Sequence, residues 1–553
     1  MPVAPYTGTF GRSELKHLLQ RALFGATNAD LAHFAGRSVT QVVDALLTIG
    51  PPPSPPVKNY WVLSGGSPDP DGIDPSVPFG STWVNSPNVT AAVNANIGRM
   101  SSFQSWRIGS MITQDRTLEE KLVLFWYNHM PTQMSVVFNG LLYYGYDSLL
   151  RTNCVGNFRQ MMYGVTTDPC MLEYLNGRLN TASAPDENYA RELMELFTLG
   201  EGSGYTEDDV QAAARVLTGW STREITDTGS PILPETFFEP AWHDNTNKTF
   251  SGFFANTVIQ GQSGANGGAT ELNAMLDMIF ARQQVSLFIC RQLYRFFVHG
   301  EIDAAAEANA IVPLAELFRN NASSPDQMKI VMRAMFTSDH FFSANIRSCM
   351  VMSPADLIIG LLRKMDAPWP NETTQMEARY KMFLDTYYMV LNCGQPLLDP
   401  PSVAGWNAYY QAPQFDELWM DSASYASRNF AMQGIIGQGF STGNDLYQTT
   451  SRNLLMKVEL VDVVAQFSDP TDPGTLVSDA AELLFGIGVS LSVEGQLKIT
   501  RLLLGQQNDM YWTDAYEAYV ADPDTTDQTA QMVPNLLLYL FLDMAKAAET
   551  QVH

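Results

Sequence analysis

The sequence predicts a mainly α-helical protein, a large multi-helical body with one β-hairpin insertion. Apolar residues recur at positions i, i+3, i+4 and i+7 wherever the sequence is regular, which is the spacing of an amphipathic helix. Apolar residues also make up 45% of the 553 residues, enough for a substantial core. Only one segment shows the alternation and the turn residues that are typical of paired strands.

Start and stop signals mark several of the helices. Ser38 and Gln41 form a capping box ahead of apolar residues at helical spacing. Thr117 and Glu120 open a helix that Pro131 ends, because proline has no N–H to donate. Further helices are expected at 13–23, 97–114, 157–165, 188–199, 207–218, 271–281, 284–298, 303–319, 328–336, 355–365, 417–435, 453–467, 475–486, 492–504 and 531–548.

Two stretches interrupt this helical pattern. Residues 50–95 hold ten prolines, and loops of this length are usually either functional or disordered. The large aromatic residues within the stretch favour a segment that packs onto the body. In the second stretch, residues 221–262, aromatic and polar residues alternate around the turn-forming run 244–247, which predicts a β-hairpin with strands at 237–243 and 248–254.

The order of these segments predicts two domains. A helical domain, residues 1–440, includes the proline-rich excursion at 50–95 and the hairpin region at 221–262. The run 441–445 is rich in Ser, Thr, Gly, Asn and Asp, which is typical of a linker. We therefore expect a C-terminal helical subdomain at 441–553.

Charge and hydropathy exclude two classes of function. The chain has 33 basic and 58 acidic side chains, a formal charge of −25, which repels nucleic acids and anionic membrane surfaces. No apolar run approaches the ~18 residues that span a bilayer, so we expect no membrane insertion. Residues 1–30 lack the apolar stretch of an export signal, which predicts a protein that is either cytoplasmic or already trimmed.

The five cysteines form no C-x-x-C pair and so suggest neither a zinc site nor a redox motif. We expect most of them to be small buried apolar residues, with room for one disulfide.

The densest group of polar residues begins at Glu187. Asn188, Arg191, Glu192 and Glu195 fall at i, i+3, i+4 and i+7 and therefore share one stripe of a helix. Apolar residues fill both flanks, so the helix is expected to be largely buried. Its polar stripe must then be paired, bind an ion or line a cleft. Alternatively, Arg191 and Glu195 form an ordinary ion pair on a narrow solvated face.

His129 lies on the apolar face of its helix and should point inward, with Asn128 on a neighbouring face. Such a histidine is commonly a satisfied core residue. If it instead meets Glu192 and Glu195, the group has the acid and base of a hydrolytic site, or the nitrogen and oxygen ligands of a divalent metal, with His129 and Glu192 as the first ligands.

Two loops are further candidates. The predicted hairpin tip carries His243, Asp244 and Lys248, which form either part of a site or a turn bonded through its own side chains. The loop 394–406 is stiffened by proline and ends in Trp406, and it either walls a binding cleft or fastens two helices together.

These segments resemble, in order, the signatures of the bacterial family called domain of unknown function 1800. Family members usually have histidine where this chain has Tyr127, which removes one potential ligand beside His129, and they commonly begin with an export signal. The resemblance covers residues 17 to about 433 and is carried by 17–25, 121–129, 187–200, 205–210, 217–220, 243–248 and 394–406.

The resemblance implies a helical fold and a periplasmic or secreted setting. It also implies a sulfatase-like partner protein, because genes of the family often neighbour those of such proteins. It supplies no reaction. The candidate substrate-binding residues are Asn188, Arg191, Asn128, Trp220, His243, Asp244 and Trp406.

The leading hypothesis is an extracytoplasmic hydrolase that acts on a polar polymer such as a glycan. Glu187, Glu192, Glu195 and His129 would be its catalytic residues, with Glu192 as the base and His129 as its partner or a metal ligand. One alternative is a non-catalytic scaffold or secreted assembly component that binds the sulfatase-like partner. Another is a metal-dependent oxidative enzyme, which needs at least two ligands besides His129.

Overall fold

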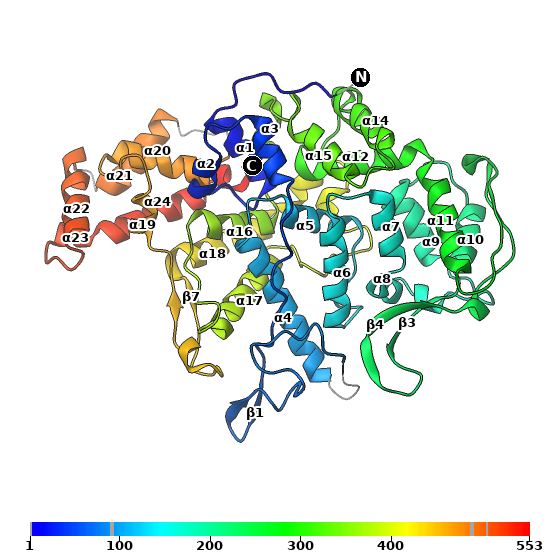
Figure 1. Cartoon of the computed structure of the whole chain (residues 1–553). Helices are drawn as coiled ribbons and strands as arrows, with labels where there is room; N and C mark the ends of the chain where they lie inside the picture. The colour runs from blue at the N-terminus through cyan, green and yellow to red at the C-terminus, as the bar shows by residue number, and fades with distance from the viewer. Residues whose placement is uncertain (1–2, 89–92, 487–491, 505–506) are drawn as a thin grey trace.

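The computed structural model describes residues 3–88, 93–486, 492–504 and 507–553, and their architecture confirms the mainly α-helical prediction (Figure 1). Three short π-helical segments, η2 (Leu193–Thr198), η5 (Glu307–Ile311) and η9 (Gly434–Gln438), continue α-helices of the described part. The α-helices are α1 (Arg12–Ala22), α2 (Asn28–Phe34), α3 (Val39–Leu46), α4 (Val93–Ile112), α5 (Glu119–His129), α6 (Gly140–Asn153), α7 (Phe158–Thr166), α8 (Pro169–Tyr174), α9 (Asn188–Glu192), α10 (Glu207–Val216), α11 (Gly267–Phe280), α12 (Gln283–Phe297), α13 (Ala304–Ala306), α14 (Val312–Asn320), α15 (Gln327–Phe336), α16 (Pro354–Lys364), α17 (Met376–Asn392), α18 (Ser422–Gln433), α19 (Leu460–Val464), α20 (Pro473–Leu484), α21 (Val493–Leu504), α22 (Asp509–Ala521), α23 (Gln528–Gln531) and α24 (Val533–Ala545).

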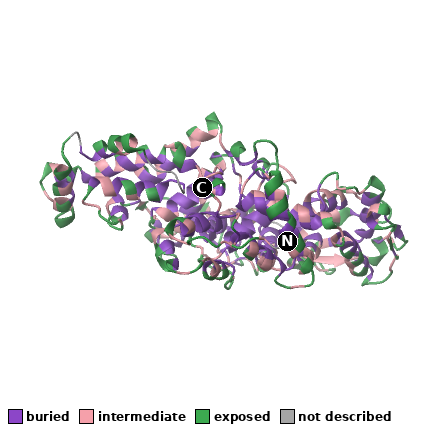
Figure 2. Cartoon of the chain, turned by 90° about the horizontal axis from the view of Figure 1, so that it is seen from above, coloured by how far each residue is buried: buried purple, intermediate pink, exposed green. Residues whose placement is uncertain are grey.

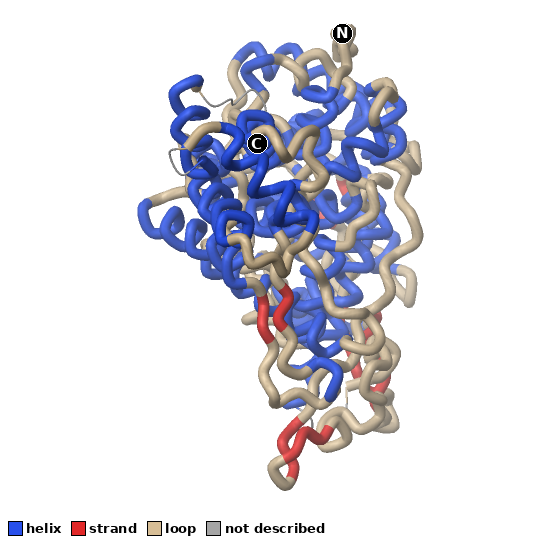
Figure 3. The backbone as a smooth tube through the Cα atoms, turned by 90° about the vertical axis from the view of Figure 1, so that its left-hand side faces the viewer, coloured by secondary structure: helices blue, strands red, loops and turns tan. Residues whose placement is uncertain are grey.

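Strands are short and form two-stranded antiparallel pairs (Figure 3). The described pairs are β1 (Val62–Ser64) with β2 (Ser67–Asp69), β3 (Trp220–Ile225) with β4 (Pro231–Phe238), β5 (Lys248–Thr249) with β6 (Val258–Ile259), and β7 (Phe440–Ser441) with β8 (Leu455–Met456).

The predicted insertion at 221–262 contains a hairpin, but the predicted strands were wrong. Strands β3 and β4 pair with Trp220 opposite Phe238, and their turn uses Gly229, whose φ of +82° suits glycine. The run 244–247 does not join two strands. Its Asp244 instead accepts hydrogen bonds from the backbone N–H and the hydroxyl of Thr246, a turn closed by its own side chains.

Helix α5 lies at the centre of the body (Figure 1), and all of its residues are buried. Buried residues run through the interior of the whole body, while exposed ones lie at its rim (Figure 2). The capping box predicted at Ser38 and the end of α5 before Pro131 are both confirmed. Gly25, with φ +75°, lets the chain after α1 approach α16 closely, because a Cβ there would lie 3.1 Å from the backbone of Gly360. This close approach brings the N-terminal part of the chain next to α16, which is more than 300 residues away in the sequence.

Charged residues of α5 find their counter-charges on these neighbouring helices. Glu120 lies 2.7 Å from the Arg107 guanidinium on α4 and 2.5 Å from that of Arg151 on α6. Lys121 pairs with Asp356 on α16. All these side chains are at least nine-tenths buried, so each isolated charge would be costly.

The proline-rich stretch packs onto the body, as its aromatic residues predict, although residues 89–92 lie outside the described part. Trp83 is fully buried and donates to the Ser102 hydroxyl of α4 at 3.1 Å. Buried Lys58 donates to three backbone carbonyls of the stretch, and Arg99 of α4 pairs with Asp74. These contacts hold the irregular backbone against α4.

The C-terminal part contains helices α19 to α24 in its described residues. Residues 441–445, which were predicted to be a linker, run from the last residue of β7 into the connection between β7 and β8, and the buried Thr442 hydroxyl donates to the Ser451 carbonyl. The helix predicted at 453–467 is restricted to α19, since residues 455–456 form β8. Backbone hydrogen bonds then join residues 350–352 to residues 551–553.

The charge network of α5 should dominate stability. We expect Glu120→Gln to lower the free energy of unfolding by about 1.5–3 kcal/mol, because it removes the charged acceptor that two buried guanidinium groups share. Both groups keep Asp147, and Arg151 also keeps Glu119. Asp44→Asn is the matched control, since Asp44 pairs with Arg333 at 2.6 Å but both side chains are about half exposed; it should cost under about 1 kcal/mol. Urea denaturation of both variants measures this difference, and equal losses would contradict it.

Candidate functional site

The predicted polar stripe lies on α9 and the π-helical segment η2. Leu193, Met194 and Phe197 are buried and fix the inner face of this segment. Glu192 and Glu195 are left half-buried at its edge. The change from α-helix to π-helix falls directly after Glu192, and such π-helical segments are frequent at functional sites.

The sequence left open an ion pair between Arg191 and Glu195, but Arg191 pairs with other carboxylates. Its Nη2 lies 2.6 Å from a carboxylate oxygen of Glu207 on α10 and 3.2 Å from one of Glu187. Asn188 is exposed. Glu187 and Arg191 therefore belong to a partly solvated ion-pair group, in which each charge is already matched.

Glu192 differs from these neighbours because it has no hydrogen bond or ion pair in the described part of the chain. Burial raises the pKa of its carboxyl group, and the charge of Glu195 raises it further, against the opposite effect of Arg191. Glu195 accepts a hydrogen bond from the Tyr205 hydroxyl at 3.4 Å. The structure thus places two half-buried carboxylates near enough to interact, and the pKa of one of them, Glu192, is raised.

His129 is enclosed by aromatic rings and does not face the glutamates. Its ring is parallel to that of Phe125, with centroids 5.9 Å apart, and Phe158 and Phe288 lie at similar distances. Its Nε2 bonds to the backbone carbonyl of Phe197 at 3.0 Å. The helix of the glutamates therefore does reach His129, but it presents main chain and not side-chain carboxylates.

Asn128 and Trp406 form a sealed contact. The Asn128 side-chain oxygen accepts from the backbone N–H of Trp406 at 2.9 Å, and both residues are buried. Gly405, at φ +85°, allows this approach, since a Cβ there would lie 2.4 Å from Asn128. The loop 394–406 thus fastens onto α5, which was one of its two predicted roles.

His243 and Lys248 meet at Glu271 of α11, a residue that the sequence analysis missed. Glu271 lies 3.1 Å from His243 Nε2 and 2.5 Å from Lys248 Nζ, and its side chain is fully buried. Asp244 instead pairs with Arg215 of α10 at 2.6 Å, which together with its other hydrogen bonds holds its pKa below the usual range. No signal in the sequence links Glu271 to the distant His243.

Trp220 lies at the start of β3 and is partly buried, with its ring 5.3 Å from that of Phe238. It packs within the hairpin, and in the described part of the chain it makes no hydrogen bond or ring contact with the glutamates of α9 and η2. The predicted candidates thus separate into a carboxylate pair, an aromatic enclosure around His129 and a buried charge cluster at Glu271.

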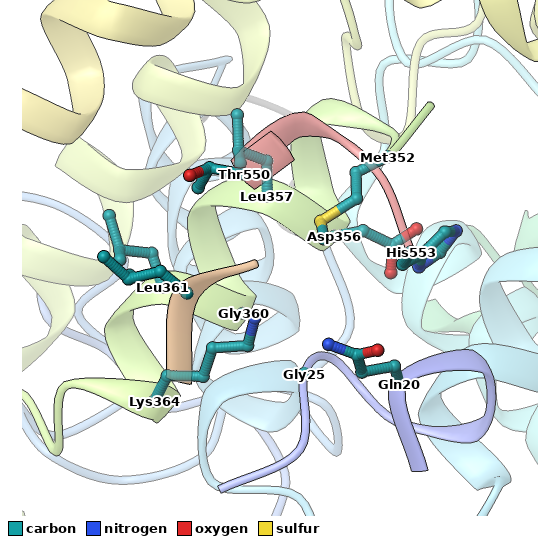
Figure 4. A pocket seen from close by; sticks show the side chains of 11 residues that line it. Gln20, Gly25, Met352, Asp356, Leu357, Gly360, Leu361, Lys364, Thr550 and His553 are labelled. Carbon is teal, nitrogen blue, oxygen red and sulfur yellow. The ribbon is translucent and has the colours of Figure 1, made fainter. Parts of the chain in front are cut away.

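The structure also contains a small cavity between α1, α16 and the chain near residue 550, which the sequence analysis did not predict (Figure 4). Gln20, Asp356, Lys364 and His553 contribute polar groups to its wall, and neither amide atom of Gln20 has a partner in the described residues. Its volume of about 10 Å³ is that of about one water molecule. The cavity is therefore too small for an organic substrate.

The described residues contain no group of three or more His, Cys, Asp and Glu side chains that could hold a metal ion. They also contain no helix that is long and apolar enough to span a membrane.

The chain belongs to a family of proteins of unknown function, DUF1800, whose model matches residues 17–545. The family predicted from the sequence is thereby confirmed, and the match extends beyond residue 433 through most of the C-terminal part. No curated protein and no solved structure matches the chain.

The enclosure of His129 should make stability depend on pH. Burial lowers the pKa of His129 to about 4, although the Phe197 carbonyl opposes this. Between pH 6.5 and 4 the unfolded chain binds the additional proton, so folding stability falls as pH decreases through this window, by up to about 3 kcal/mol for this residue.

We expect His129→Gln, which keeps a donor for Phe197 and does not titrate, to reduce this loss. Unfolding free energies at several pH values measure it, with exposed His33→Gln as the matched control. An unchanged pH dependence in His129→Gln would show that His129 is not held in its neutral form.

Proposed function

We propose that the chain is a hydrolase that uses Glu192 and Glu195 to cleave a polar polymer such as a glycan. The observation that carries the proposal is the half-buried, unpartnered carboxyl group of Glu192 next to a second glutamate. A carboxyl group that has no structural partner and a raised pKa is typical of a functional site.

The two glutamates would divide the chemistry between them. Glu192, with its raised pKa, retains a proton at a higher pH than ordinary glutamate and suits a general acid that protonates the leaving group. Glu195 would be the base that activates water or the nucleophile. This assignment differs from the base role expected for Glu192, because the pKa of Glu192 is raised and its expected partner, His129, bonds to the Phe197 carbonyl instead.

Aromatic residues beside the pair fit a sugar-like substrate. Tyr205 contacts Glu195 through its hydroxyl. Burial, with Asp399 and Glu192 nearby, raises the pKa of Tyr174 to about 12, so this phenol stays neutral beside the site. The exposed Asn188 lies on the same short helix and would bind polar groups of the substrate, whereas the guanidinium of Arg191 on that helix is already paired with Glu187 and Glu207.

A periplasmic or secreted setting is part of this proposal. It rests on the setting that the family resemblance in the sequence implies.

Screening purified protein against polysaccharides and nitrophenyl glycosides tests the proposal. We expect Glu192→Gln to reduce the detected hydrolysis about 10²–10⁴-fold, the usual contribution of a general acid, while circular dichroism and unfolding stay unchanged. Glu201→Gln is the matched control, since Glu201 is exposed in the same segment. Wild-type protein without hydrolytic activity, or full activity in Glu192→Gln, would reject it.

A non-catalytic scaffold is the second candidate, and the sealed contacts of Asn128, His129, His243 and Trp406 favour it. In that case the structure serves to present a surface to the sulfatase-like partner. Co-purification of the two proteins, with no hydrolysis by this chain, would support it over the enzyme.

A further inference from the structure

A second pocket, separate from the glutamate pair, lies at the C-terminal end of α12. It has a volume of about 530 Å³, in the range of small-molecule sites. Three carboxylates line it, Glu301, Asp303 and Asp339, together with His299 and His340. The described residues of its lining include no lysine or arginine, so the pocket disfavours anions.

Cys349 lies beside this pocket and is the one cysteine that is not fully buried. Its S–H donates to the carbonyl oxygen of Ile346, which lines the pocket, at 3.1 Å, and it lies 3.7 Å from that of Val298. The side chain of His299, a second lining residue, lowers the pKa of this thiol. All five cysteines are free thiols. The other four are buried, and burial raises the pKa of each: Cys154, Cys170, Cys290 and Cys393.

Arg21 supplies a positive charge at the same sulfur. Its side chain is 1% exposed, and in the described residues it forms no ion pair with a carboxylate. Its Nη2 lies 3.4 Å from Cys349 Sγ and 3.0 Å from the Ile346 carbonyl, and its Nη1 contacts the sulfur of Met350. A buried cation needs a counter-charge, and a Cys349 thiolate provides one.

His299 is oriented to support that thiolate. The backbone N–H of Glu301 donates to its Nδ1 at 3.0 Å, so the neutral ring carries its proton on Nε2 and can donate it to sulfur. Burial raises the pKa of the Cys349 thiol, but the hydrogen bond from His299 and the charge of Arg21 outweigh it, and the net pKa lies below the usual value. Asp416 is a further carboxylate near these groups, since the charges of Arg21 and His299 both act to lower its pKa.

We propose that Cys349 is a reactive thiol, activated by His299 and Arg21, that forms a mixed disulfide with small cationic or neutral disulfides entering this pocket. The thiolate attacks one sulfur of the disulfide, a new S–S bond forms to Cys349, and the original S–S bond breaks. The other sulfur leaves as a thiolate and takes a proton from water. The small disulfide is the oxidant, and no further reactant is needed.

Two disulfides of similar size and opposite charge test the proposal on the full-length protein. Cystamine carries two ammonium groups, and dithiodiglycolate carries two carboxylates. We expect cystamine at pH 7 to modify Cys349 at least tenfold faster than the other four cysteines and at least tenfold faster than dithiodiglycolate does, as measured by peptide mass spectrometry.

Variants separate activation from mere exposure. Cys349→Ser should abolish the rapid modification. His299→Leu should slow it about tenfold or more, whereas His340→Gln, which alters a residue of the same pocket that bonds to Tyr294 and not to the sulfur, should leave the rate within about twofold. Circular dichroism checks that each variant is folded.

Several outcomes would overturn the proposal. Cys349 that reacts only in denaturant is not accessible. An unchanged modification rate in folded His299→Leu would show that His299 does not activate the thiol. Faster modification by dithiodiglycolate than by cystamine would show that the acidic lining does not select the reagent. Should His299→Leu not fold, the two-probe comparison on the wild-type protein decides alone.

Discussion

The requirement that the buried charges of α5 be neutralised constrains the rest of this fold. Glu120 and Lys121 stand on a helix with no solvated face, so their partners must come from other helices. Arg107, Arg151 and Asp356 supply them from α4, α6 and α16. An ion pair without water tolerates little displacement, so these contacts set how the four helices are arranged.

The same enclosure decides what the C-terminal end of α5 can do. Asn128 is engaged by the loop that ends at Trp406, and His129 by aromatic rings and the carbonyl of Phe197. These residues join α5 to the loop and to η2, and so they support the segment that carries Glu192 and Glu195. Asn128 and His129 therefore have structural roles, while the unpaired carboxyl group of Glu192 lies at the edge of the segment that they support.

Local patterns predicted much of the helical framework. The capping box at Ser38 and the stop at Pro131 depend only on neighbouring residues, and both are present. Helices α6, α17 and α22 were missed because apolar and aromatic residues surround much of their circumference, which weakens the helical period. The hairpin strands were misplaced because Asp and Asn favour turns of several kinds, and residues 244–247 form one closed by side chains.

The sequence by itself determined the helical class, the family and the stripe from Glu187 to Glu195, since these follow from composition, spacing and motif order within short stretches. Only the tertiary structure decided which charges are matched. Glu271 reaches His243 and Lys248 from another helix, and Arg21 reaches Cys349 across more than 300 residues of sequence. Burial and long-range contacts set the protonation of such groups, and neither is encoded in any local pattern.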